Sequence, residues 1–510
     1  MDSTGDNMRE HLAITIRDDK MSYDNPGMVY DGNTTEMKFR RLSNVNGPCV
    51  GKEAAESKSE KLPRDHKSIY IQNQNSFHPH KSAEKEYDPY DNRVVKHPTT
   101  YWETLIHMLK ASLGTGILAM PEAFHNAGYA VATIGTIVIG FLCTYTIHIL
   151  ISTEYELCKR KKLPSMTYPA TAQASVADGP KAIRGLAPAV PIICNIFLLL
   201  YQIGSCCIYV VFISTNIKDV CDYYFPEQQL DIKLYMLMIL LPLILINWVR
   251  NLKYLAPLSS IANAVTLVSF VIIFYYMFDD VPAVSTRDAV APFKGMPLFF
   301  GTVLFAMEAI GVVMPLENEM KEPRKFGNTF GVLNCAMVPI TLLYTFVGFF
   351  GYLKYGPDVK GSITLSLPAH EKLAQAARLM LAFAIFITHA LACYVAVDIS
   401  WKEFCEPHVK KWKTFGEYIV RTLLVLLTIA LAAAIPYLEL FIALIGALCL
   451  STMGLAFPAL IQLFTYWYEY TGAQFVLFFL KNLTIVSISL LGFGVGTYTS
   501  IMAIVEEINK

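Results

Sequence analysis

The sequence predicts an all-α integral membrane protein built on two inverted helical repeats. Of its 510 residues, 54% are hydrophobic and only 16% are charged, whereas a soluble domain carries about 25% charged residues. A spanning helix needs about 20 apolar residues, and eleven segments of the chain fit or nearly fit this length. The first and sixth segments run in opposite senses and are both interrupted by glycine and proline. Interrupted helices at matching positions of two halves indicate a transporter with a binding site near the middle of the membrane.

The predicted spans divide the chain into a tail, a transporter domain and a short end. Residues 1–97 are polar and charged with few apolar runs, so we expect a disordered cytosolic tail. Residues 98–505 form the transmembrane transporter domain, and residues 506–510 form a short C-terminus outside the cell or in a lumen. The eleven spans are residues 101–124, 128–152, 190–213, 234–249, 255–278, 297–316, 329–353, 373–398, 417–436, 438–464 and 473–503.

The basic residues predict the orientation of the chain. Cytosolic loops of membrane proteins are enriched in Lys and Arg. With a cytosolic N-terminus, the inner loops hold fifteen of these residues and the outer loops hold seven. We therefore expect the N-terminus in the cytosol and, because the number of spans is odd, the C-terminus on the opposite side.

The first span is interrupted near its middle. Gly114 and Gly116 flank Thr115, and Pro121 follows five residues later. Glycine weakens a helix by roughly 1 kcal/mol, and an interior proline removes a hydrogen bond. Because backbone groups freed in hydrocarbon must find a partner, we expect this break to line a cavity and its N–H groups to bind a carboxylate; close helix packing is the alternative. The predicted substrate-binding residues are Ser112, Leu113, Gly114, Thr115, Gly116, Ile117 and Leu118.

The sixth span carries an ionisable residue at its interruption. Glu308 is followed by Gly311 and Pro315. A charged group in mid-span costs at least ~2.5 kcal/mol, which marks it as a functional candidate. We expect Glu308, with Phe305 and Ala309, either to hold the substrate ammonium or to bridge the broken helix. Small residues at both breaks leave room for a small zwitterion and little for a long side chain.

Two histidines are candidates for a proton-coupling site. Glu103, His107 and Lys110 share one face of the first half-helix. Histidine titrates near neutrality, with an ordinary pKa of about 6.5. We expect His107 to couple protons; the alternatives are an interfacial role for His107 and coupling at His389, deep in the eighth span.

Charged residues also cluster after the sixth span and at the start of the tenth. The cluster after the sixth span predicts a solvated cytosolic loop, with a latch on an inner gate as the alternative. Glu439 either lines the outer mouth or caps a helix. The cluster comprises Glu317, Glu319, Lys321, Glu322, Arg324 and Lys325.

From Tyr101 to about Val505 the chain resembles the amino acid/auxin permease superfamily. Within it, the chain is similar to the proton-assisted amino-acid transporters of solute carrier family 36. This resemblance implies a LeuT-like fold of five plus five helices in an inverted repeat, with an eleventh helix added. It is carried by IHMLKASLGTGILAMPEAFHNAGY (106–129), YQIGSCCIYVVFISTNIK (201–218), FAMEAIGVVMPLENEMKEP (305–323) and LELFIALIGALCLS (438–451).

The resemblance also implies a function. It implies proton-coupled symport of small neutral amino acids, of the alanine, glycine and proline class, at the plasma membrane or a lysosomal or endosomal membrane. It places the proton-linked histidine of the family at His107. The chain departs from the family pattern in the eighth span, where His389 and Ala392 stand in place of an aromatic residue and a glutamine.

Other functional classes fit the sequence less well. The chain contains no phosphate-binding loop, no H-E-x-x-H and no nucleophile elbow, so we do not expect an enzyme. We expect no cofactor and no metal, with H⁺ as the driving ion, and a net charge of zero indicates no nucleic-acid partner. The alternatives are a membrane amino-acid sensor and a proton-independent facilitator or exchanger. Sodium coupling stays open, and the sequence predicts no oligomeric state.

Overall fold

The fold is described from a computed structural model of the chain, which describes residues 87–250, 252–307 and 310–509. Within these ranges nine helices are long and apolar enough to cross a membrane, and α8 (Ile232–Asn247) is a shorter apolar helix. The predicted first span is a broken helix made of α2 (Tyr101–Ser112), α3 (Thr115–Leu118) and α4 (Met120–Ala127). The all-α membrane fold is confirmed, and the count of eleven spans stays a prediction.

The long helices follow the predicted spans closely. The sixth span is divided into α10 (Met296–Ala306) and α11 (Ile310–Asn318), but Gly311 and Pro315 lie within α11 rather than at the interruption. The others are α5 (Tyr129–Lys161), α7 (Val190–Tyr224), α9 (Leu252–Phe278), α12 (Val332–Tyr355), α14 (Lys372–Ile399), α15 (Lys413–Ala434), α16 (Leu438–Ile445) continuing to α17 (Phe457–Thr465), and α18 (Gly472–Leu491) continuing to α19 (Thr497–Ile508).

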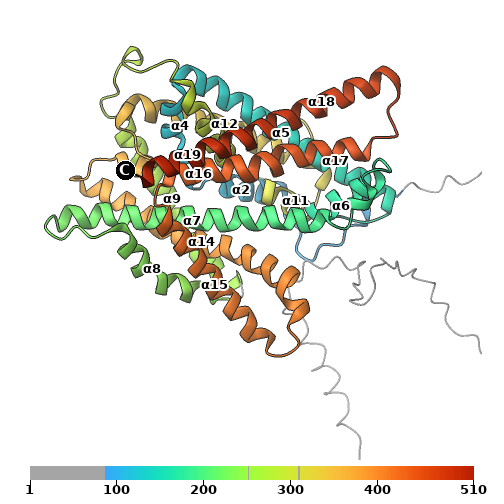
Figure 1. Ribbon diagram of the computed structural model, residues 1–510, viewed down its shortest axis with the longest axis horizontal. Helices are drawn as coiled ribbons and strands as arrows, with labels where there is room; N and C mark the ends of the chain where they lie inside the picture. Colours follow the sequence, from blue (N-terminus) through green and yellow to red (C-terminus); the bar gives the residue numbers. More distant parts are fainter. Residues whose placement is uncertain (1–86, 251, 308–309, 510) are drawn as a thin grey trace, which may run out of the picture. The chain divides into compact units, whose positions relative to one another are not determined.

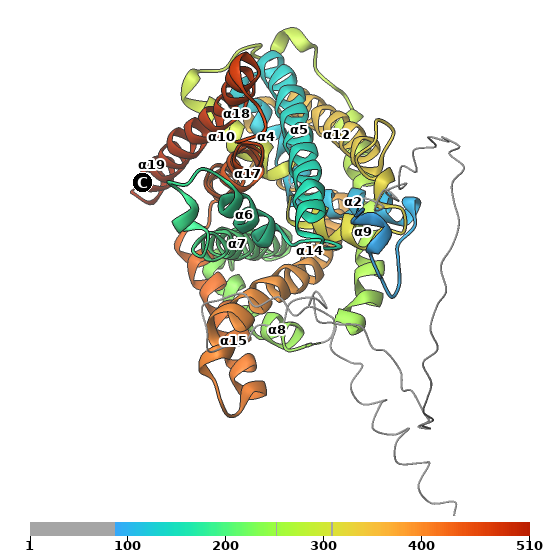
Figure 2. The same ribbon diagram turned by 90° about the vertical axis from the view of Figure 1, so that its right-hand side faces the viewer.

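The helices form two groups on either side of α7. Figures 1 and 2 both show α8, α14 and α15 on one side of α7, with α4, α5, α12 and α18 on the other. In the first group α15 packs on α8 and α7, and α14 packs on α7 and α9; in the second, α10 packs on α16, and α12 packs on α4 and α5. The two broken helices belong to the second group.

Short helices between the spans were not predicted. α6 (Tyr168–Asp178) packs against α7 and α17, and its Tyr168 hydroxyl donates to the Met453 carbonyl over 2.7 Å. α13 (Ile363–Ser366) lies in the loop before α14. Both are too short for an apolar-run criterion, because their stability comes from packing on long helices rather than from their own length.

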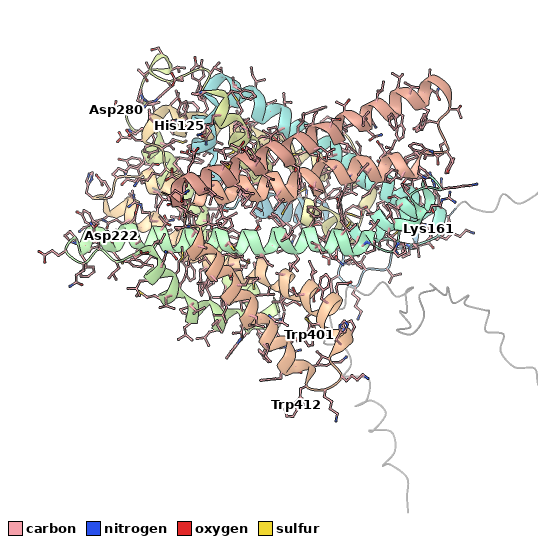
Figure 3. All side chains as sticks on the ribbon, in the orientation of Figure 1. His125, Lys161, Asp222, Asp280, Trp401 and Trp412 are labelled. Atoms are coloured by element: carbon pink, nitrogen blue, oxygen red, sulfur yellow. The ribbon has the colours of Figure 1, made fainter. Side chains whose placement is uncertain are left out.

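The two ends of the molecule carry different residues. Figure 3 shows His125, Asp222 and Asp280 at one end of the long axis and Lys161 at the other. Lys161 lies in the last turn of α5 with Lys159 and Arg160, where cations suit the helix dipole. The Lys161 end is the one that the basic-residue count assigns to the cytosol.

Candidate functional site

The first broken helix leaves helical geometry where the glycines predicted. α2 begins with a capping box, in which the Glu103 carboxylate accepts from the Thr100 N–H over 2.8 Å, and such a cap stabilises a helix by about 1 kcal/mol. α2 ends at Ser112; Leu113 has ψ 77° and Gly114 is extended with φ −127° and ψ −154°. Pro121 lies in the first turn of α4, where proline has no hydrogen bond to lose, and the turn at Ala119 that separates α3 from α4 directly precedes it.

One hydroxyl at the break has no partner. The Ser112 hydroxyl donates to the Met108 carbonyl over 3.2 Å, and the Ser112 carbonyl accepts from the Tyr344 hydroxyl. Thr115 is 3% exposed, and its hydroxyl makes no hydrogen bond within the described residues. Because a buried polar group without a partner is costly, Thr115 is the group at this break that is available to a ligand.

The two glycines of the break face different surroundings. A Cβ atom added to Gly116 would lie 2.6 Å from the Ala306 Cα, so α3 packs directly on α10. A Cβ atom added to Gly114 would meet no atom within 4 Å. The side chains of Ile117 and Leu118 are buried in the core, so the predicted binding of substrate by these two residues would use their backbone groups. The break therefore borders open space at Gly114 and the second broken helix at Gly116.

The second break lies beside the first. α10 ends at Ala306 and α11 resumes at Ile310; Glu308 and Ala309 lie outside the described residues. Phe305 is buried, and its ring lies 6.3 Å from the Tyr201 ring of α7. Among the predicted substrate residues, the structure therefore brings Phe305 and the Leu113–Leu118 stretch together across the α3–α10 contact.

The family comparison agrees with this geometry. Residues 97–502 match the sequence model of the family described as "Transmembrane amino acid transporter protein". The chain belongs to this family. It is a membrane transporter of amino acids rather than an enzyme.

Individual proteins similar to this transporter are known. "Proton-coupled amino acid transporter-like protein pathetic" of Drosophila melanogaster is 39% identical over 448 residues, covering 87% of this chain and 94% of that protein. "Probable amino acid transporter skat-1" of Caenorhabditis elegans is 26% identical, and the match covers 80% of this chain and 90% of that protein. A solved structure described as the inward facing conformation of Mhp1 has a TM-score of 0.52 at 14% identity, covering 81% and 92%, and this likeness concerns the fold alone.

The two candidate histidines of the transporter lie in different surroundings. His107 is exposed on α2. His389 is fully buried in α14, and its Nδ1 lies 3.4 Å from the Asn247 Nδ2 of α8. Nε2 of His389 has no hydrogen-bond partner within the described residues. Asn247 is in turn held through its carbonyl by Arg421 of α15, so His389 belongs to the α8–α14–α15 contact.

Glu122 is a half-buried acidic residue of the transporter that the sequence analysis did not single out. Glu122 of α4 has a buried Oε2 that makes no hydrogen bond within the described residues. Glu439 is half-buried against the loop that holds α13, where a Cβ atom on Gly361 would lie 2.2 Å from its Oε2. The signal for Glu122 was an acidic residue inside an apolar span.

The charged cluster that was predicted to form a solvated loop differs from this prediction at Glu317, which lies in the last turn of α11. Glu317 is not solvated: its side chain is 3% exposed and lies 3.0 Å from the Arg93 guanidinium. The side chains of Glu322, Arg324 and Lys325 are exposed, as a solvated loop requires. Within the described ranges, no three His, Cys, Asp or Glu side chains are grouped as a metal ion would need.

Proposed function

We propose that this transporter carries small neutral amino acids of the alanine, glycine and proline class together with protons. The observation that carries the proposal is the helix break at Gly114, which combines open space with the unpaired Thr115 hydroxyl. In this proposal the backbone of Leu113 to Leu118 and the Thr115 hydroxyl bind the substrate carboxylate. Glu308 binds the ammonium group. The Drosophila relative is named as a proton-coupled transporter-like protein, which supports the proton as the driving ion.

The energetics favour such a coupling. One proton carried with a neutral amino acid moves one net charge, which is worth ~2.3 kcal/mol per 100 mV. A tenfold proton gradient adds about 1.4 kcal/mol, and together these terms concentrate the substrate roughly several-hundredfold. We assign the proton site to His107, with His389 as the alternative, and place the protein in the plasma membrane or a lysosomal or endosomal membrane with a cytosolic N-terminus.

Uptake into liposomes tests this function. Purified protein is reconstituted, and radiolabelled amino acids are scanned with and without an inward proton gradient. Alanine, glycine and proline should accumulate above equilibrium with the gradient and should be competed poorly by arginine or glutamate. Equal rates without the gradient would identify a facilitator or exchanger, and binding without flux would identify a sensor. A tag at each terminus, probed in intact and permeabilised cells, tests the orientation.

A further inference from the structure

Residues 88–100, here called the strap, join the two broken helices at one end of the molecule. Thr99 pairs with the segment after α11: its N–H donates to the Glu319 carbonyl, and its carbonyl accepts from the Lys321 N–H, both over 2.9 Å. The strap leads directly into α2 through Thr100. Figure 2 shows this blue segment before α2 at the edge of the helical bundle. Any separation of α2 from α11 must therefore break the Thr99 pairing.

Arg93 anchors the strap in the transporter domain. Its side chain is 5% exposed, and Nε donates to the Pro164 carbonyl over 2.9 Å. Nη1 donates to the Glu317 carbonyl over 3.1 Å and lies 3.0 Å from the Glu317 Oε1. Nη2 lies 3.8 Å from the Glu154 Oε2, and the guanidinium lies 4.9 Å from the centre of the Tyr90 ring.

The charges in this cluster do not balance. One guanidinium faces two carboxylates, and the Glu154 and Glu317 side chains are 2% and 3% exposed. Burial lowers the pKa of Arg93, but the charges of Glu317 and Glu154 outweigh burial and raise that pKa above its usual range, so Arg93 stays charged. Nη2 of Arg93 and Oε1 of Glu317 make no well-aligned hydrogen bond within the described residues.

Other titratable groups surround the cluster without balancing its charge. Tyr90 and Cys158 face it, Tyr155 packs on Tyr90 with ring centres 4.7 Å apart, and all three are neutral groups. Burial and the charge of Glu317 raise the pKa of Tyr90, so this phenol adds no second negative charge. On the exposed side of the strap, Arg324 pairs with Asp88 and Asp91 over 2.5 and 3.0 Å.

The two carboxylates depend on the strap to different degrees. Glu154 Oε1 accepts from the Cys158 thiol over 3.0 Å and from the Met166 N–H over 2.9 Å, and neither donor belongs to the strap. The side chain of Glu317 interacts with Arg93 and Tyr90, and both belong to the strap. Withdrawal of the strap therefore takes the counter-charge of Arg93 away from the Glu317 carboxylate, which is unfavourable while that carboxylate is ionised.

We propose that the Arg93–Glu154–Glu317 cluster is a proton-binding site, in which Glu317 takes up a proton from the adjoining solution when the strap withdraws. The proton bonds to a Glu317 carboxylate oxygen and returns to solution when Arg93 comes back. Because opening consumes a proton, acid on the strap side favours the released strap. The site is separate from the substrate break and from His107, and it requires no particular substrate.

Hydrogen exchange on the full-length protein in lipid nanodiscs tests the site. Peptides covering residues 88–100 and 319–325 are followed at pH 7.5 and 5.5, with rates corrected for intrinsic exchange. In the wild type, protection should fall on acidification by up to about tenfold per pH unit, the limit for one proton. Glu317→Gln should exchange fast at both pH values, because its neutral side chain mimics the protonated state. Glu154→Gln should keep the acid-dependent loss of protection.

Three variants make the test specific. Arg93→Gln should release the strap at both pH values, and it gives an independent result if Glu317→Gln folds poorly. Glu319→Gln, whose side chain is exposed two residues from Glu317, should behave as the wild type. Arg324→Gln removes the exposed pairs with Asp88 and Asp91 and should retain the pH response. A wild type without pH response, or a Glu317→Gln variant with the wild-type response, would overturn the proposal. Since the readout needs no transport, failure of the proposed function leaves this test intact.

Discussion

Gly116 of α3 and Ala306 of α10 form a close contact between the two broken helices. A Cβ atom on Gly116 would lie 2.6 Å from the Ala306 Cα and 3.1 Å from its Cβ. Backbone atoms on the α10 side cannot rotate away as a flexible side chain would. The spacing between the two halves of the site is therefore set by the absence of a side chain at residue 116.

Gly116→Ala should destabilise the protein and impair transport. The added methyl forces α3 and α10 apart, and overpacking of this kind costs about 1–3 kcal/mol. Thermal unfolding in detergent, together with uptake in liposomes, measures both effects. Gly114→Ala is the matched control: its methyl meets no atom within 4 Å, so the unfolding temperature should stay at the wild-type value while KM for substrate rises. Equal stability of both variants would contradict the packing role of Gly116.

Thr115→Val should weaken substrate binding without weakening the fold. The variant keeps the shape of the side chain and removes a buried hydroxyl that has no partner within the described residues. A hydrogen bond to a charged group contributes about 1.5–3 kcal/mol, so KM should rise roughly tenfold or more. Thr136→Val on α5 also removes a buried hydroxyl that has no partner among the described residues, and it should leave KM unchanged. A similar KM for both variants would exclude a substrate contact at Thr115.

Tyr344→Phe should destabilise the first half of the broken helix. The Tyr344 hydroxyl donates to the carbonyl of Ser112, and Ser112 is the last residue of α2. Loss of this donor from a buried carbonyl costs about 1–3 kcal/mol. Tyr355→Phe removes a hydroxyl that has no hydrogen-bond partner in the described part of the chain, and this change should be neutral or stabilising. Unfolding temperatures of the two variants decide the matter, and a larger loss in Tyr355→Phe would refute the argument.

The interruption of the first helix could be predicted because its cause is local, whereas Gly311 and Pro315 lie inside α11 and do not mark the second interruption. Gly114 and Gly116 lack side chains and weaken the helix at their own positions. The same reasoning did not foresee that Pro121 would sit in the first turn of a new helix, because that depends on where the preceding break ends. The glycines predicted where the helix is interrupted. That Gly116 packs on Ala306 could be seen only in the folded structure, because the two residues are far apart in the sequence.

The strap could not be predicted from the sequence, because its partners are far away along the chain. Residues around Arg93 are polar, which is typical of a disordered tail, and a boundary at residue 97 was expected. In the structure the compact unit starts at Asp88, and Arg93 pairs with residues 61 and 224 positions later. A burial of this kind depends on tertiary contacts that no local pattern encodes. Glu317 was predicted to be solvated for the same reason.

His107→Ala should abolish acid-stimulated, current-carrying uptake while leaving the protein at the membrane. His107 is exposed on α2, the half-helix that ends at the Gly114 break, so its protonation can respond to movement of that helix. His389 is buried against Asn247 of α8, where protonation would place an unpaired charge in the interior. His389→Ala should therefore lower stability and retain the pH dependence of uptake.

Substrate-evoked current recorded against external pH in both variants decides between the two histidines. Surface labelling confirms equal amounts of protein at the membrane, and the unfolding temperature separates loss of fold from loss of coupling. A normal pH profile in His107→Ala, with loss of the profile in His389→Ala, would move the coupling site to α14. If the wild type shows neither current nor pH dependence, symport is wrong and facilitated exchange or sensing takes its place. The strap site then remains testable, because its hydrogen-exchange readout needs no transport.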